Sequence, residues 1–212
     1  MNILLSTAYF GPVWWYSLLR RADRVYIEAC ESYQKQTLRN RCTIGSANGP
    51  LTLTVPVSYA PVAAGEERCR RGVQDMLVSD HGQWRHLHWQ ALVSAYRDTP
   101  FFCYYADDLH PFFERSDWPT LWQLNMATLH TLCSLMGLQT RFELTTDYIP
   151  ADSLPDGVLD LRTSRGSHGE LWPSCWQPQA YWQPFIARQG FMPGLSILDL
   201  LFCMGPEARL YL

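Results

Sequence analysis

The first 29 residues constrain the fold more than any other part of the chain. Residues 3–10 form a short apolar run, Gly11-Pro12 marks a turn, and apolar residues then recur at helical spacing from Val13 to Ala22. The segment DRVYIEA, residues 23–29, has the pattern of a second strand. We predict a βαβ unit, because a helix that connects two strands of one sheet in this way makes them parallel, with a right-handed crossover.

A β-hairpin is predicted next. Asn48-Gly49 favours a tight turn with positive φ, and apolar residues alternate with Thr and Pro over residues 51–57. Pro56 cannot donate a ladder hydrogen bond, so the second strand is an edge strand or ends there. Residues 58–72 have the composition of a polar loop, and residues 73–78 predict a further strand.

Three helices are predicted in the middle of the chain. Asp80 and Gln83 have the spacing of a capping box, which would begin a helix that runs to about Arg97. The segment FFCYYADDLHPFFER predicts a second helix. The third begins at Pro119 and ends at Gly137.

The last part of the chain predicts a strand over residues 140–146, a long loop over 149–175 and two short helices in YWQPFIARQG and LSILDLLFCMG. The fold class is therefore α/β, or α+β. We expect a small mixed sheet begun by the βαβ unit and the hairpin, followed by a mainly helical second half. A length of 212 residues fits a single domain. Its expected parts are a sheet-forming part (1–80), a helical part (81–137) and a C-terminal part (138–212).

Charge and cysteine content limit the function classes. A net charge of −3 argues against a general nucleic-acid or membrane-surface binder, which needs excess positive charge on a broad face. The seven cysteines form no CxxC pair, which indicates free thiols. The N-terminus lacks a cationic lead and Gly11-Pro12 interrupts its apolar run, so we expect neither a signal peptide nor a membrane span, and a cytoplasmic protein.

The first candidate site is the basic cluster Lys35, Arg39, Asn40 and Arg41, which follows the second predicted strand. Ligands of open α/β sheets bind beyond the carboxyl ends of the strands, and Arg and Lys bind phosphate. The cluster therefore predicts a phosphate site. The alternative is that these cations are solvated or pair with acidic residues nearby: Asp23, Glu28 and Glu31.

The second candidate site is Arg85 with His88. On a helix, His86 and His88 point about 200° apart and cannot chelate one metal ion. A single imidazole beside Arg85 is typical of an acid/base or positioning pair, and its alternative is a structural histidine. Asp199 lies in an otherwise apolar helix, where it either anchors an arginine or faces water.

Motifs of several common enzyme classes are missing. The sequence contains no GxSxG, GxGxxG, Walker phosphate loop or HExxH. Asp107-Asp108 are adjacent on a helix and point about 100° apart, which favours solvated charges over a two-carboxylate site. We therefore predict no metal site, and the sequence identifies no cofactor.

Several segments together resemble the WbqC-like protein family. They are YFGP, RADRVYIE, YQKQTLRNRCTIGSANGPLTLTVPV, WRHLHWQALVSAYRDTPFFCYYADD and LSILDLLFCMGPE, which span nearly the whole chain. The positions that match the family pattern are Lys35, Asn40, Arg41, Trp84, Arg85, His88, Asp199, Gly205, Pro206 and Glu207. The chain departs from the pattern at Ala29-Cys30-Glu31, where many relatives have an acidic pair, and at Cys203, where Asn is usual.

The resemblance implies a role in the biosynthesis of O-antigen or other surface polysaccharides. We expect an enzyme that transfers an acyl or aminoacyl group to a nucleotide-activated amino sugar, so that its partner is a phosphorylated small molecule such as a nucleotide sugar. Lys35, Arg39 and Arg41 would hold phosphate, Arg85 would orient the donor or stabilise negative charge, and His88 would accept a proton. The alternative is a non-catalytic binding or assembly protein. A nucleotidyl transferase ranks last, since the paired-histidine motif is missing.

Overall fold

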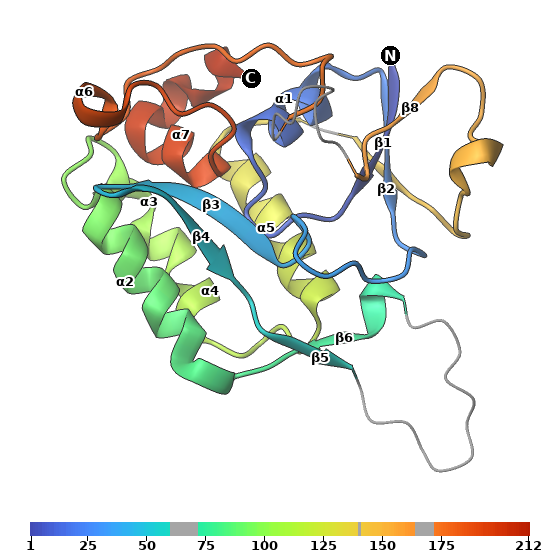
Figure 1. The fold of residues 1–212 in the computed structure, drawn as a ribbon, viewed down its shortest axis with the longest axis horizontal. Helices are drawn as coiled ribbons and strands as arrows, with labels where there is room; N and C mark the ends of the chain where they lie inside the picture. The colour runs from blue at the N-terminus through green and yellow to red at the C-terminus, as the bar shows by residue number, and fades with distance from the viewer. Residues whose placement is uncertain (60–71, 140, 164–171) are drawn as a thin grey trace.

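The computed structural model describes residues 1–59, 72–139, 141–163 and 172–212 (Figure 1). Its strands are β1 (Asn2–Ser6), β2 (Arg24–Glu28), β3 (Arg41–Ser46), β4 (Gly49–Thr54), β5 (Val57–Tyr59), β6 (Met76–Val78), β7 (Glu143–Leu144) and β8 (Val158–Asp160). Its α-helices are α1 (Val13–Arg21), α2 (Trp84–Tyr96), α3 (Phe102–Leu109), α4 (Pro111–Glu114), α5 (Leu121–Leu135), α6 (Ile186–Gln189) and α7 (Ile197–Met204). Short 3₁₀ helices cover Val73–Asp75, His81–Gln83, Ala151–Ser153 and Gly205–Tyr211.

A four-stranded sheet in the order β7-β2-β1-β8 is parallel throughout. The predicted βαβ unit is confirmed, because β1 and β2 pair in parallel with α1 between them. The first strand ends at Ser6, earlier than its apolar run, since the chain turns at Phe10, which has a φ of 41°. Because all four strands are parallel, their carboxyl ends lie at the same edge of the sheet.

The predicted hairpin is also confirmed. β3 and β4 pair antiparallel from Arg41 opposite Thr54 to Ser46 opposite Gly49, and Gly49 has a φ of 110°. A second antiparallel pair joins β5 to β6. The strand predicted over residues 73–78 is half wrong, because Val73–Asp75 forms a 3₁₀ helix and only Met76–Val78 is extended. Residues 60–71 of the predicted polar loop lie outside the described residues.

The helical part differs from the prediction in two places: the second predicted helix is divided into α3 and α4, and the first does not begin as expected. The proposed capping box of Asp80 and Gln83 is wrong: Gln83 has a φ of 49°, and the carboxylate of Asp80 pairs with Arg85 instead. A capping box does begin α5, where the Thr120 hydroxyl accepts from the amide of Gln123 and the Gln123 side chain accepts from the amide of Thr120.

The long loop predicted over residues 149–175 contains a strand. Val158–Asp160 forms β8, which pairs in parallel with β1, and the next residue, Leu161, is buried and donates its amide to the carbonyl of Leu4 at 2.8 Å. Residues 164–171 of this segment lie outside the described part of the chain. β8 has no recognisable signal in the sequence because three residues are too few for a periodic pattern.

Helix α7 lies beside α6 and the C-terminus (Figure 1) and is packed among elements from several parts of the chain. Its sequence is apolar on every side, and every residue from Ile197 to Cys203 is buried against α1, α2, α3 and β3. The predicted α/β class is thus confirmed: the chain has a small parallel sheet, hairpins and a mostly helical second half. The parallel strands and the hairpins are hydrogen-bonded as separate sheets.

Candidate functional site

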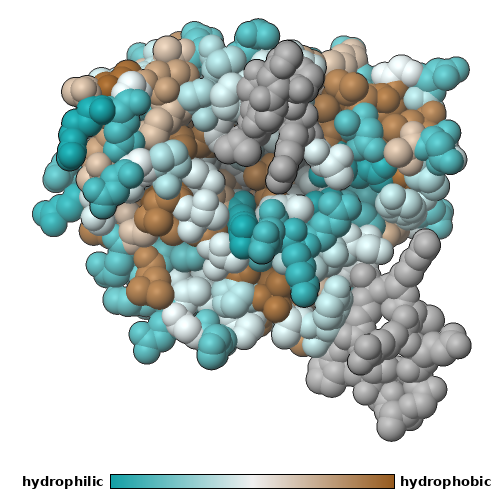
Figure 2. Space-filling view, in the orientation of Figure 1, coloured by the Kyte–Doolittle hydropathy of each residue, from teal (hydrophilic) through white to brown (hydrophobic). Residues whose placement is uncertain are grey.

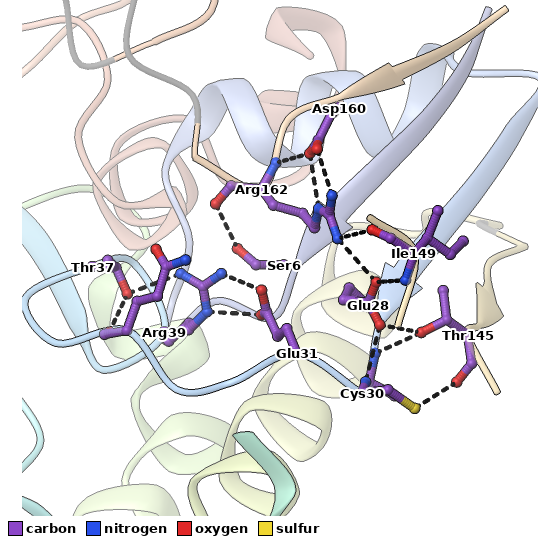
Figure 3. Close-up of polar contacts among 12 residues, drawn as sticks. Ser6, Glu28, Cys30, Glu31, Thr37, Arg39, Thr145, Ile149, Asp160 and Arg162 are labelled. Atoms are coloured by element: carbon purple, nitrogen blue, oxygen red, sulfur yellow. Dashed lines mark hydrogen bonds and ion pairs between the residues drawn. The ribbon is translucent and has the colours of Figure 1, made fainter. Parts of the chain in front are cut away.

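The carboxyl ends of the four parallel strands bring together charged residues from distant parts of the chain (Figure 3). Glu28 is the last residue of β2, and Asp160 is the last residue of β8. Glu31, Arg39 and Arg162 follow these strands in the loops. Because parallel strands end at one edge, this is where an open α/β sheet binds its ligands.

Arg162 is held by two carboxylates. Its Nε and Nη2 donate to the two oxygens of Asp160 at 2.9 and 2.6 Å, and its Nη1 donates to Glu28 at 3.1 Å and to the carbonyl of Ile149 at 2.7 Å. Glu28 is fully buried, and it also accepts from the Thr145 hydroxyl at 2.6 Å and from the amide of Cys30 at 3.0 Å. Glu28 therefore ties together the ends of β2, β7 and β8.

Arg39 forms a second buried ion pair. Its Nε donates to one oxygen of Glu31 at 2.7 Å, and its Nη2 donates to the other. Its Nη1 donates to the hydroxyl of Thr37 at 3.1 Å. Only 1% of Arg39 and 3% of Glu31 is exposed. The structure thus places Arg39 in the ion pair that the sequence left open as an alternative.

The charges shift one another's pKa values. Burial alone would raise the pKa of Asp160, but hydrogen bonds from Arg162 lower it below its ordinary value. The hydrogen bonds that Arg162 donates to Asp160 in turn raise the pKa of Arg162. Burial raises the pKa of Glu31, against the opposing effect of Arg39. Burial and the charge of Glu28 raise the pKa of Cys30, so its thiol is a poor nucleophile at neutral pH.

Three connected hollows open around this cluster. The inner cavity, of about 420 Å³, is lined by Cys30, Glu31, Ser32, Gln34, Gly72, Tyr148, Ala151, Asp160, Arg162 and Thr163. The middle groove, also about 420 Å³, is lined by Pro12, Gln34, Gln36, Thr37, Leu38, Arg41, Cys42, Thr43, Thr52, Arg162, Thr163 and Gly194. The tyrosine pocket, of about 320 Å³, is lined by Tyr33, Lys35, Gln36, Asn40, Arg41, Thr54, Val55, Pro56, Val57, Tyr59 and Met76.

Neighbouring hollows share lining residues, so they lie side by side, and we refer to them together as the cleft. Gln34, Arg162 and Thr163 line both the inner cavity and the middle groove. Gln36 and Arg41 line both the middle groove and the tyrosine pocket. In the space-filling view, hydrophilic residues gather over the loop that precedes β3 and over the start of that strand (Figure 2).

The residues predicted to bind phosphate differ in their exposure and in their contacts at this cleft. Lys35 is exposed at the tyrosine pocket, and Arg41 lies on the wall between that pocket and the middle groove. No hydrogen bond or ion pair joins the Arg41 guanidinium to the described residues, and its Nε is inaccessible to solvent. Asn40 is buried, and its Nδ2 donates to the carbonyl of Val55 at 3.0 Å. The structure therefore brings Lys35, Asn40 and Arg41 together, with Arg39 behind them.

Arg85 and His88 lie away from the cleft. Neither lines the three hollows; Arg85 pairs with Asp80, and its Cζ lies 4.6 Å from the centre of the Trp84 ring. His88 is buried, with its Nδ1 3.0 Å from the Tyr9 hydroxyl. Burial lowers the pKa of His88 to about 4, against the opposing effect of a hydrogen bond to the carbonyl of Thr54. His88 is thus a neutral core residue that supports the end of β4.

Neither expectation for Asp199 is confirmed, because it neither anchors an arginine nor faces water. It is buried and accepts hydrogen bonds from the hydroxyls of Tyr96 and Tyr181 at 2.8 and 2.6 Å and from Gln183 at 2.9 Å. Burial raises its pKa above the ordinary value. Asp199 therefore joins α2, α7 and the segment around residue 181 without an arginine.

Sequence reasoning missed Asp160 and Arg162, and it considered Glu28 and Glu31 only as partners of the cations. The signal that could have found Asp160 and Arg162 is VLDLR, a short apolar run that ends in charged residues like RVYIE before it. Among the described residues, no group of three His, Cys, Asp or Glu side chains could hold a metal ion. None of the helices within the described ranges is long and apolar enough to cross a membrane.

Comparison with known proteins gives the family. The chain is 28% identical to Uncharacterized protein Rv1507c of Mycobacterium tuberculosis, over 93% of this chain and 91% of that protein. No solved structure is significantly similar to it. The model of the WbqC-like protein family matches residues 8–173, which include the loop before β3, α2 and β8. The chain therefore belongs to the WbqC-like protein family.

Proposed function

We propose that this protein is an enzyme that transfers an acyl or aminoacyl group to the amine of a nucleotide-activated amino sugar in surface-polysaccharide biosynthesis. One observation carries the proposal. Arg41, which has no partner among the described residues, lies in the wall of a cleft at the carboxyl ends of the parallel strands. The sugar and the pathway come from the family resemblance, whereas the phosphate site comes from this geometry.

The Arg41 guanidinium, which contacts no partner within the described ranges, is suited to phosphate. A partly buried cation has lost much of its hydration, so a bound anion stabilises it more than it would stabilise an exposed cation. Arginine also offers a planar set of donors that matches phosphate oxygens. Lys35 adds a mobile positive charge at the same pocket. In this proposal Arg41 and Lys35 hold the phosphates, and Arg39 keeps Glu31 and the loop in place.

Glu31 is the group best placed to accept the proton. It lines the inner cavity, and burial raises its pKa above the ordinary value of a glutamate. The amine nitrogen attacks the acyl carbon, a C–N bond forms, and the bond to the donor's leaving group breaks, with its electron pair kept by that group. The amine proton passes to the Glu31 carboxylate. We assign this role to Glu31 because His88 lies in the core.

The non-catalytic alternative meets one of its two criteria. An exposed apolar patch on residues 101–113 with no polar cleft near Arg85 would favour it. Arg85 lines none of the three hollows, but Phe102, Phe112 and Phe113 are buried in the core, and Tyr104 is the large hydrophobic residue that this segment exposes.

Thermal stabilisation of the purified protein tests the proposal. The ligands are nucleotide sugars, ATP and acyl-coenzyme A, each at about a hundredfold excess over its dissociation constant, where binding stabilises by about 2.7 kcal/mol. In a chain of this size that corresponds to a rise of roughly 5–10 °C in the melting temperature. We expect an amino-sugar nucleotide to give such a rise, and Arg41→Ala to abolish it.

Arg24→Ala is the matched control, because Arg24 is an exposed cation at the opposite end of β2. It should keep the full stabilisation. The proposal is overturned if no phosphorylated ligand raises the melting temperature, or if the two variants lose the effect equally.

A further inference from the structure

The tyrosine pocket differs in character from the rest of the cleft. Two tyrosines, Tyr33 and Tyr59, line it together with apolar residues that include Val55, Val57 and Met76. Tyr33 is half-buried and Tyr59 is exposed, so both rings contribute surface to the pocket. A volume of about 320 Å³ lies at the lower end of small-molecule sites, which span about 300–1,000 Å³. The pocket is thus suited to one flat ring system.

The floor of this pocket is rigid. The amide of Val55 donates to the carbonyl of Asn40 at 2.8 Å, and the Asn40 side chain donates to the carbonyl of Val55 at 3.0 Å. Behind it, the Asn125 side chain donates to the carbonyl of Arg39 at 2.8 Å. A cavity whose backbone is fixed in advance loses less entropy when a ligand binds.

Arg41 lies on the side of the tyrosine pocket that borders the middle groove. Arg41 and Gln36 form the wall that it shares with the middle groove. Tyr33 and Arg41 both line this pocket, and the positive charge of Arg41 opposes the rise that burial causes in the pKa of the Tyr33 hydroxyl. A flat ring in the tyrosine pocket would therefore place an attached phosphate beside Arg41. From there the middle groove continues to the inner cavity through Arg162.

We propose that the tyrosine pocket binds the nucleobase of a nucleoside diphosphate, with the diphosphate at Arg41 and the attached sugar directed toward Glu31 and Asp160. Aromatic side chains stack on any base, because every base has a flat π-face. The inner cavity is lined by the carboxylates of Glu31 and Asp160 and the guanidinium of Arg162, which can hydrogen-bond to the hydroxyl and amine groups of a sugar. This inference rests on the proposed function and adds the direction in which the substrate lies.

Calorimetric titration of the full chain separates the base from the phosphates. The ligands are UDP, dTDP, GDP, ADP and inorganic pyrophosphate, which has no base. We expect the preferred nucleoside diphosphate to bind at least tenfold more tightly than pyrophosphate. Tyr33→Ala and Tyr59→Ala should each weaken that nucleotide at least fivefold and change pyrophosphate less than twofold. Tyr33→Phe keeps the ring and should retain nucleotide binding.

The failures of the two proposals are distinguishable. If pyrophosphate and all four nucleotides bind equally well, and neither tyrosine variant matters, the base site is overturned while the phosphate site remains. If Arg41→Ala leaves the binding of pyrophosphate unchanged, or if no ligand binds, the phosphate site and the proposed function fail as well. Because Tyr59 is exposed, Tyr59→Ala gives a readout even if Tyr33→Ala does not fold.

Discussion

Arg39 and Arg41 lie two residues apart and have different surroundings. Arg39 is enclosed and makes a two-point ion pair with Glu31, whereas the Arg41 guanidinium reaches a cleft with no partner among the described residues. Arg39 is therefore part of the structure of the loop, and Arg41 is available to a ligand. Two variants can separate these roles.

Arg39→Ala should lower the free energy of unfolding by about 3–5 kcal/mol, because it leaves Glu31 buried without its cation. Arg41→Ala should change it by less than about 1 kcal/mol, since no ion pair is lost. Urea unfolding of the two variants beside the wild type measures both values. Equal stabilities of the two variants would contradict this division of roles.

His88 makes a pH-dependent contribution to stability. Its pKa in the folded protein is about 4 and its ordinary value is about 6.5, so the unfolded chain binds more protons between these pH values. The free energy of unfolding therefore falls as the pH falls from 6.5 to 4, by about 3 kcal/mol in all for this group. Above pH 6.5 the histidine is neutral in both states and contributes no pH dependence.

Urea unfolding at several pH values between 7.5 and 4.5 tests this contribution. The difference in stability between wild type and His88→Asn should shrink over this range, because the variant has no group to protonate. His86→Asn is the control, since His86 is exposed on the same helix, and its difference should stay constant. Parallel pH profiles for wild type and His88→Asn would show that His88 is not a buried neutral residue.

At the scale of elements, the turn after α7 depends on a glycine. Gly205 has a φ of 54°, and a Cβ atom there would overlap the ring of Phe101. Gly137, after α5, has a φ of 62° with open space around the same position. The two glycines share the backbone strain of a left-handed residue and differ in the steric overlap, so they form a matched pair.

Gly205→Ala should therefore cost more than Gly137→Ala. The left-handed conformation costs alanine about 1–2 kcal/mol at either position, and overlap with Phe101 adds about 1–3 kcal/mol at Gly205 alone. Chemical denaturation of both variants gives the difference. A Gly137→Ala variant that is as unstable as Gly205→Ala would show that packing against Phe101 is unimportant.

The elements with a local signal could be predicted from the sequence. The hairpin turn depends on Asn48-Gly49, and the end of α5 depends on Gly137, whose conformations are set by the residues themselves. β8 could not be predicted, because its three residues are extended only through pairing with β1, more than 150 positions away. The predicted capping of α2 is wrong because Asp80 forms an ion pair with Arg85 instead of capping the helix.

The candidate site was predictable only in part. The position of Lys35, Asn40 and Arg41 at the cleft followed from a basic loop after a parallel strand. The Glu28–Arg162 ion pair joins residues 134 positions apart, and nothing in either segment points to the other. The burial of His88 was one of two alternatives that a single sequence could not separate, because histidine occurs in both settings.

At the scale of the whole molecule, the cleft is assembled from separate parts of the chain. Arg41 is the first residue of β3, Asp160 ends β8 and Arg162 follows it, and Tyr148 lies in the segment after β7. The parallel order β7-β2-β1-β8 brings these parts to one edge. The central claim is that a phosphorylated ligand binds at this edge.

Hydrogen exchange detected by mass spectrometry tests this claim most directly, because it locates protection along the chain. The ligand is whichever of UDP, dTDP, GDP and ADP stabilises the protein most. We predict slower exchange in peptides that cover residues 29–41 and 145–163, and no change in Arg41→Ala under the same conditions. Protection confined to α2 and α5, or no protection with any of the four nucleotides, would contradict the account.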